Sequence, residues 1–288
     1  MNAHEDPDLG RSRHLGWLSV LGLLSSLACA TSPAISLPAI GGSATHEFQP
    51  GRFVWLDLVT PDLESAQAFY GGLFGWTFES GNDYVTVLHA GAPIAGMVSR
   101  DVDEGSLWIS SLSVADVDRA AERVGQAGGV VQRGPLDAGE RGRMALVTDP
   151  GGALVLLLRA TGGDPPDVRA EPGAWFWREL WTHDVSQALA FYATVADYER
   201  RKVSFRGGTY TVLETDGEAR AGVAELPDPE VRSNWLPYVR VKDPDLTVTR
   251  AETLGARVLV RDENAAILLD PNGAPLGIQR WPLEGGER

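Results

Sequence analysis

The feature that most constrains the fold of this chain is a sixteen-residue segment that occurs twice. WLDLVTPDLESAQAFY occupies residues 55–70 and WRELWTHDVSQALAFY occupies residues 177–192, with eight identical positions. A second pair, DPGGA at 149–153 and DPNGA at 270–274, keeps nearly the same offset. Self-similarity at a fixed period indicates repeated units, and each unit here has the size of an independent domain. The sequence therefore predicts two homologous domains, at residues 51–160 and 173–282.

Composition and charge limit the kinds of molecule that this protein is expected to bind. The chain has 288 residues, of which 43% are hydrophobic, so it can bury two cores. Its formal net charge of -14 repels phosphate backbones and anionic lipid, which excludes nucleic acid as an expected partner. The single cysteine, Cys29, leaves no partner for an intrachain disulfide or a paired-cysteine metal site.

The N-terminal residues have the order of an export signal. Arg11 and Arg13 precede an apolar run at 15–28, which is too short to span a bilayer comfortably. The segment ending in Cys29 resembles the lipobox of bacterial lipoproteins, which implies lipidation of that cysteine and a lipid anchor as the only membrane contact. Cleavage after Ala30 is the alternative, and a leader that does not function would leave the protein cytoplasmic.

The rest of the chain divides at stretches of small and polar residues. Residues 30–50 are rich in Ser, Pro, Gly and Ala and are expected to form a flexible tether. The predicted order is an export signal at 1–29, the tether at 30–50, the first domain at 51–160, a linker at 161–172, the second domain at 173–282 and a tail at 283–288.

Each domain is predicted to be α+β and to consist of two βαβββ modules. A strand at 53–59 ends at Pro61, and Asp62 can cap a helix whose apolar residues recur at helical spacing. Short strands follow at 76–79, 84–89 and 93–99. The same order of elements restarts at 108–114 and is repeated in the second domain.

The strand before D-[LV]-x-x-[AS]-x-x-FY, with D-P-x-G before the last strand, resembles the vicinal oxygen chelate (VOC) superfamily. This superfamily includes glyoxalases, bleomycin-resistance proteins and extradiol dioxygenases. The resemblance implies that paired modules form a cup-shaped mixed sheet with the helices outside, and that metal-using members place their ligands in the cup. It does not by itself imply one function.

The positions at which the resemblance implies metal ligands carry side chains that cannot bind a metal. They are occupied by Trp55, Ile109 and Leu156 in the first domain and by Trp177, Leu236 and Gly277 in the second. A divalent ion needs three or four converging donors. We therefore expect no cofactor, and a divalent metal would require nonstandard ligands.

Strand alternation predicts which side chains share the inner face with those positions. A carboxylate in a cup is costly unless it is paired, so Glu179 is predicted to pair with Arg240, whereas Asp57 faces only serines. The alternative is that the tryptophans fill the cup and the carboxylates only support it. The candidate ligand-binding residues are Trp177, Glu179, Trp181, Tyr238 and Arg240 in the second domain and Trp55, Asp57 and Ser111 in the first.

Three functions remain open on this basis. The first is a bacterial cell-envelope protein, similar to bleomycin-resistance members, that binds a small organic molecule, cationic or hydroxyl-bearing, in an aromatic-lined cup. The second is an enzyme, a glyoxalase-type lyase or isomerase or a dioxygenase, with nonstandard ligands or a carboxylate base. The third is a structural or interaction module.

Overall fold

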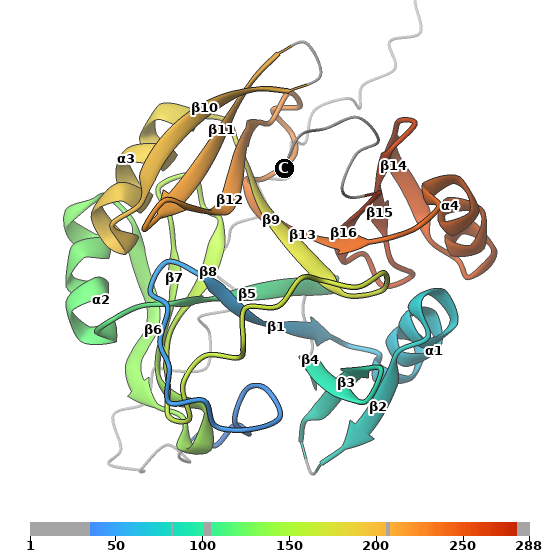
Figure 1. Ribbon diagram of the computed structural model, residues 1–288, viewed down its shortest axis with the longest axis horizontal. Coiled ribbons are helices and arrows are strands. Elements are labelled where there is room, and N and C mark those ends of the chain that lie inside the picture. The colour runs from blue at the N-terminus through green and yellow to red at the C-terminus, as the bar shows by residue number, and fades with distance from the viewer. Residues whose placement is uncertain (1–34, 82, 101–104, 206–207, 281–288) are drawn as a thin grey trace, which may run out of the picture. The chain divides into compact units, whose positions relative to one another are not determined.

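The computed structural model describes residues 35–81, 83–100, 105–205 and 208–280. They form two eight-stranded mixed sheets of the same topology, one in each repeat (Figure 1). This arrangement confirms two tandem α+β domains built from paired βαβββ modules. The predicted export signal, Cys29 and the predicted tail lie outside the described residues. No helix in the described part of the chain is long and apolar enough to cross a membrane.

The first sheet has the order β2-β3-β4-β1-β5-β8-β7-β6 and carries two helices. Its elements are β1 (Phe53–Thr60), α1 (Leu63–Phe74), β2 (Thr77–Ser80), β3 (Val85–His89), β4 (Ala92–Ser99), β5 (Leu107–Ser113), α2 (Val117–Gln126), β6 (Val130–Asp137), the short helix η1 (Gly139–Arg141), β7 (Gly142–Thr148) and β8 (Leu154–Ala160).

The second sheet has the order β10-β11-β12-β9-β13-β16-β15-β14 and also carries two helices. Its elements are β9 (Trp175–Thr182), α3 (Val185–Ala196), β10 (Glu199–Phe205), β11 (Gly208–Thr215), β12 (Glu218–Glu225), β13 (Asn234–Arg240), α4 (Pro244–Thr253), β14 (Arg257–Arg261), β15 (Ala265–Leu269) and β16 (Pro275–Gln279).

An aspartate begins every one of the four α-helices in the described residues. The side chains of Asp62, Asp116, Asp184 and Asp243 each accept a hydrogen bond from the backbone N–H three residues further on. Such a cap satisfies one of the N–H groups that a helix leaves without a partner. The aspartate of the repeated segment is therefore the residue that turns the chain from the central strand into the helix.

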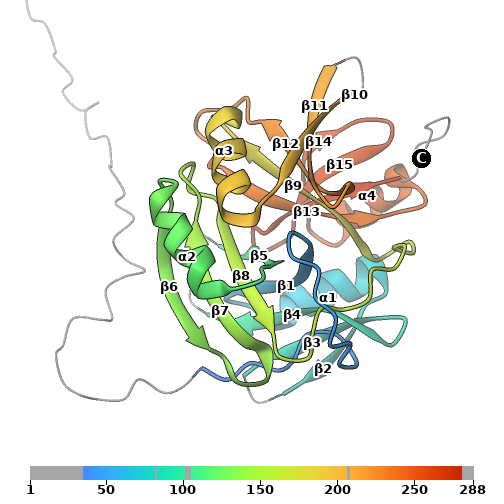
Figure 2. The same cartoon turned by 60° about the vertical axis from the view of Figure 1, so that its left-hand side comes forward.

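The two repeats share their helix-side cores. One cluster combines Val124 of α2 and Val147 of β7 with Phe191 of α3. The other combines Phe69 of α1 and Leu58 of β1 with Leu276 of β16, from the second repeat. Accordingly, α2 lies beside α3 and α1 lies beside α4 (Figures 1 and 2). The repeats had been expected to hold independent cores, whereas each buries its helices against the other.

The repeated sequence motifs meet at this shared interface. Tyr70, at the end of the first copy of the segment, donates from its hydroxyl to Oδ2 of Asp270 at 3.0 Å, and Trp108 Nε1 donates to the same hydroxyl at 2.8 Å. The second copy repeats the pattern, because Tyr192 donates to Asp149 at 3.2 Å and accepts from Trp235 at 2.6 Å. The tyrosine of each copy therefore binds the aspartate of the other repeat's D-P-x-G motif.

Residues 35–50, expected to be a flexible tether, pack against the first sheet. The side chains of Ile35, Leu37 and Ile40 belong to one apolar cluster with Trp55 and Leu156. The backbone of Leu37 is bonded in both directions, since its N–H donates to Ala138 and its carbonyl accepts from Arg141. The tether was predicted from the small and polar residues of this stretch, without regard to its three apolar side chains. Burial of those side chains offsets the conformational entropy that the segment loses when it is ordered.

The linker between the repeats holds the same N-terminal segment. Asp164 is 2% exposed and accepts hydrogen bonds through Oδ2 from Ser113 Oγ and from the backbone N–H of Gln49, both at 2.7 Å. Its own backbone N–H donates to the carbonyl of Glu47 at 2.7 Å. The linker therefore ties residues 47–49 to the central strands of the first sheet.

Candidate ligand-binding site on the second sheet

Each sheet has one face covered by helices and one face turned away from them, which we call its cup face. Alternation along β1 places Leu56 and Leu58 in the core with α1, while Trp55 lies in the separate cluster with Leu156. Trp55 is paired across the ladder with Ser111, and Asp57 with Gly96. These four residues therefore share the first cup face, as strand alternation predicts.

On the first cup face Asp57 is bound by an arginine and by aromatic donors. Arg141 Nη1 lies 2.9 Å from Asp57 Oδ2, and Tyr84 donates to Oδ1 at 2.5 Å. Arg141 Nη2 also donates to the hydroxyl of Tyr84 at 2.8 Å, and Trp55 Nε1 donates to that hydroxyl at 3.0 Å. The carboxylate, the guanidinium and the two rings form one connected network. The sequence-based expectation that Asp57 faces only serines is wrong, because Arg141, the last residue of η1, forms an ion pair with it.

Arg141 is an internal cation on this face. Its side chain is fully buried, and its Cζ lies 5.7 Å from the ring centre of Trp55 and 5.4 Å from that of Tyr84. Burial is the largest single cause and favours loss of the proton, but the charge of Asp57, Tyr84 and the hydrogen bonds to both together outweigh it, and the pKa of Arg141 is raised. Burial and then Asp57 raise the pKa of Tyr84, so the phenol keeps its proton and donates to the carboxylate. Charge on the first cup face is therefore neutralised from within.

The cup face of the second sheet repeats the carboxylate and the aromatic donors. Tyr210 donates to Glu179 Oε1 at 2.6 Å, and Trp177 Nε1 donates to the Tyr210 hydroxyl at 3.0 Å. The other oxygen, Oε2, accepts from Trp181 Nε1 and from Tyr238, both at 2.7 Å. Four of the predicted site residues, Trp177, Glu179, Trp181 and Tyr238, therefore lie in one network, with Tyr210 as an additional member.

Burial and then the Glu179 carboxylate raise the pKa of both Tyr210 and Tyr238, so these phenols remain donors. No described residue supplies a cation within 4.0 Å of Glu179. Trp177, Glu179 and Trp181 are partly exposed, whereas Trp55 on the first face is 3% exposed. Glu179 thus lies between aromatic side chains, and no cation from the described part of the chain binds it.

Arg240 does not take part in this network. Its Nη1 donates instead to the backbone carbonyl of Ala170, at 2.6 Å. The predicted Glu179–Arg240 pair is wrong, because the guanidinium binds a backbone carbonyl and the carboxylate accepts from Tyr210, Tyr238 and Trp181. Ser111, the remaining predicted residue, is fully buried on the first face, and its Oγ has no hydrogen-bond partner.

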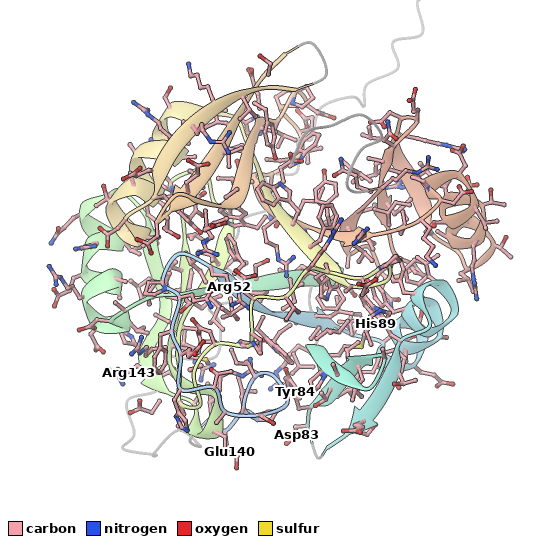
Figure 3. The ribbon with its side chains drawn as sticks, in the orientation of Figure 1. Arg52, Asp83, Tyr84, His89, Glu140 and Arg143 are labelled. Atoms are coloured by element: carbon pink, nitrogen blue, oxygen red, sulfur yellow. The ribbon has the colours of Figure 1, made fainter. Side chains whose placement is uncertain are left out.

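Sequence reasoning missed Tyr84 and Tyr210, although a signal for them was present. Both rings lie across a neighbouring strand at a glycine: a Cβ at Gly96 would collide with the Tyr84 hydroxyl, and one at Gly222 with that of Tyr210. An Ala-Gly pair stands at this place in both repeats, at 95–96 and 221–222, and its glycine marks the close approach. Figure 3 labels Tyr84, which immediately precedes β3.

The residues on the two cup faces do not fit a metal ion. The carboxylates among the predicted site residues are Asp57 on one face and Glu179 on the other, and the described residues contain no group of three or more His, Cys, Asp or Glu side chains that could hold a metal. The positions where the resemblance implies ligands are filled by Trp55 and Leu156, both buried in an apolar cluster. His183, in the turn before α3, contacts the carbonyl of Val231 instead.

The family models agree with this architecture. The model of the glyoxalase/bleomycin resistance protein/dioxygenase superfamily matches residues 52–157, and that of a glyoxalase-like domain matches residues 168–278. A relative named "Putative glyoxylase CFP32", from Mycobacterium tuberculosis, is 32% identical over 79% of this chain and 94% of its own length. The anthracycline biosynthesis protein DauV of a Streptomyces species is 31% identical over 80% of this chain and 94% of its own length.

Solved structures share the fold at low sequence identity. The Mn(II)-bound glyoxalase from Novosphingobium aromaticivorans superposes with a TM-score of 0.58 at 15% identity, covering 81% of this chain and 82% of that one. A 2,2',3-trihydroxybiphenyl 1,2-dioxygenase from Sphingomonas wittichii gives 0.56 at 15% identity, covering 81% and 91%. The chain therefore belongs to the glyoxalase/bleomycin resistance protein/dioxygenase superfamily, with two such domains in tandem.

Proposed function

We propose that this VOC protein binds a small organic molecule on its second cup face and does so without a metal there. The observation that carries the proposal is the difference between the two faces. On the first face Trp55 is buried in an apolar cluster that includes Leu37 and Ile40 of the N-terminal segment, and Arg141 binds the Asp57 carboxylate. On the second face Trp177 and Trp181 remain partly exposed beside Glu179.

The chemistry of the second face suits a guest with an aromatic or aliphatic body and a polar group. Aromatic side chains supply contact area at a low cost in side-chain entropy, and one polar anchor fixes orientation. The names of the two relatives, a glyoxylase and an anthracycline biosynthesis protein, support a small-molecule ligand for this chain as well.

The test is a fragment panel of neutral, anionic and cationic aromatic compounds, screened by ligand-observed NMR against the purified protein. We expect binding that Trp177→Leu weakens and that Trp108→Leu, made in the shared helix-side core, does not weaken in protein that remains folded. Native mass spectrometry of the purified protein adds the mass of any molecule that is retained. A panel in which no compound binds in a Trp177-dependent way contradicts the proposal.

We further propose that the protein works at the cell envelope of a bacterium. Support for this comes from the sequence alone, through the arginines, the apolar run at 15–28 and the lipobox-like segment that ends at Cys29. Ile35, the first described residue, follows the proposed lipidation site by only six positions. A lipid on Cys29 would therefore hold the first sheet within about 20 Å of the membrane surface, given about 3.5 Å per extended residue.

A further inference from the structure

The two cup faces share a chain of tryptophan, tyrosine and carboxylate, and among the described residues only the carboxylate of the first face has a cation bound to it. In the first, Trp55 and Tyr84 bond to each other and Tyr84 bonds to Asp57. In the second, Trp177 and Tyr210 bond to each other and Tyr210 bonds to Glu179, with the same indole-to-hydroxyl distance of 3.0 Å. The other oxygen of Glu179 accepts from Trp181 and Tyr238, where Asp57 binds Arg141. The first network shows how such a face holds a positive group, because the guanidinium of Arg141 lies inside it.

Arg141 shows what kind of group fits between these side chains. Its planar guanidinium donates to the carboxylate and to the tyrosine hydroxyl, and it lies within 6 Å of both ring centres. Cations at this range are attracted to the faces of aromatic rings. The carboxylate and the rings together therefore select for a positive charge on a flat or slender group, and not only for apolar surface.

The second repeat has no arginine in the corresponding place. Arg141 lies eight residues before Asp149 of the D-P-x-G motif, and the residue eight positions before Asp270 is Asp262. An acid thus replaces the base at the same point of the repeat. Arg240, the arginine that shares the second face by strand alternation, is directed to the carbonyl of Ala170.

We propose that the ligand of the second cup face is an organic cation, carrying a guanidinium or a protonated amine, that neutralises Glu179 as Arg141 neutralises Asp57. The cation binds Glu179 Oε1, which among the described residues accepts only from Tyr210, and it lies against Trp177 and Tyr210. This inference rests on the proposed function, and it adds the charge of the guest. The first face should bind no such ligand, because Arg141 already neutralises Asp57 there.

The test compares benzylammonium with benzyl alcohol, a neutral compound of nearly the same size, by isothermal titration calorimetry on the purified protein. Placing a positive group beside an uncompensated, partly buried carboxylate strengthens binding by about tenfold, which corresponds to roughly one pKa unit of interaction. We expect phenylguanidinium to share the preference. Equal affinity for the charged and the neutral compound overturns the inference.

Two variants locate the effect. Glu179→Gln should lower the affinity for benzylammonium about tenfold and that for benzyl alcohol by clearly less, because the amide oxygen still accepts from a hydroxyl but carries no charge. Glu225→Gln, at an exposed position at the end of β12, removes the same charge from the same sheet and should change neither affinity. An unchanged affinity for benzylammonium in Glu179→Gln also overturns the inference. The comparison of benzylammonium with benzyl alcohol uses the unaltered protein. It therefore tests the inference even if the Glu179→Gln variant folds poorly.

The outcomes separate this inference from the proposed function. If neutral or anionic compounds bind in a Trp177-dependent way and the cation is not preferred, the proposed binding site is supported and the proposed positive charge of its ligand is contradicted. If no compound in either experiment depends on Trp177 or Glu179, both fall together.

Discussion

The hydroxyl of Tyr70 donates to Asp270, two hundred residues further along the chain. Because Tyr192 and Asp149 form the same bond in the opposite sense, the two repeats are joined by a reciprocal pair of contacts at the end of their longest sequence match. Burial raises the pKa of both aspartates, although the tyrosine hydrogen bonds and the backbone N–H groups around each carboxylate oppose this effect. The tyrosines therefore help to keep two buried carboxylates satisfied.

Removal of either tyrosine hydroxyl should destabilise the protein to a similar extent. Tyr70→Phe leaves the N–H of Trp108 and one oxygen of Asp270 without a partner, at a cost of roughly 2 kcal/mol in the free energy of unfolding. Tyr192→Phe should cost about as much for the same reason. Urea unfolding measures both, with Thr249→Val, at an exposed position on α4, as the control. A large effect in one variant and none in the other would show that the two contacts are not equivalent.

Arg141 and Asp57 should be strongly coupled. Arg141→Met leaves the carboxylate on the first face without its cation and should cost about 3 kcal/mol. Adding Asp57→Asn should restore part of that loss, so the double variant costs less than the sum of the single ones. Arg143→Met is the matched control, because Arg143 is an exposed arginine whose pairing with Asp118 contributes little to stability (Figure 3). Additive costs at Arg141 and Asp57 would argue against the network.

The tyrosines should not ionise while the protein is folded. The chain has six, and burial is the largest cause that raises the pKa of every one. Because the folded-state pKa lies above the unfolded value of about 10, the resulting stabilisation is complete below pH 10 and is lost as the pH rises above it. Tyrosinate absorbance should therefore rise in one step together with unfolding. A gradual rise near pH 10 in protein that remains folded would contradict this prediction.

The N-terminal segment should contribute to stability. Ile40 is 6% exposed in the cluster with Trp55, and Ile40→Ala should cost about 3 kcal/mol. Val168→Ala, at a residue that is 75% exposed, should cost almost nothing. Hydrogen exchange gives an independent measure, since the amide of Leu37 is bonded to Ala138 and should be protected. Rapid exchange at Leu37, together with an unaffected Ile40→Ala variant, would mean that the segment does not remain on the first face in solution.

Lipidation is predicted at Cys29. Radiolabelled palmitate should enter the protein in a bacterial host and should be lost in Cys29→Ser. Cleavage after Ala30 without a label would indicate an ordinary signal peptide. Unprocessed protein in the cytosol, with Met1 or Asn2 at its N-terminus, would exclude both forms of export.

The fold could be predicted from the sequence because the duplicated segment contains a strand, the aspartate that caps the next helix, and the helix itself. Strand alternation also placed Asp57 and Glu179 on the faces where the structure has them. It could not predict Arg141, because the guanidinium reaches Asp57 from 84 residues away through a short turn that alternation does not describe. Tyr84 and Tyr210 were missed for a related reason. The tripeptide Thr-Val-Leu occurs at 86–88 and again at 211–213, and aligning these copies matches Tyr210 with Val85, one residue from its structural counterpart Tyr84. A bulge in each hairpin accounts for the shift.

The reciprocal tyrosine contacts also bear on how the chain is made. At about 5–20 residues per second, a ribosome needs roughly 10–40 s to add the 200 residues that separate Tyr70 from Asp270. During that interval α1 and β1 lack Leu276 and the other apolar residues of the second repeat that complete their core. The first repeat should therefore emerge with apolar surface exposed, a form that holdase chaperones bind and that also suits transport in an unfolded state.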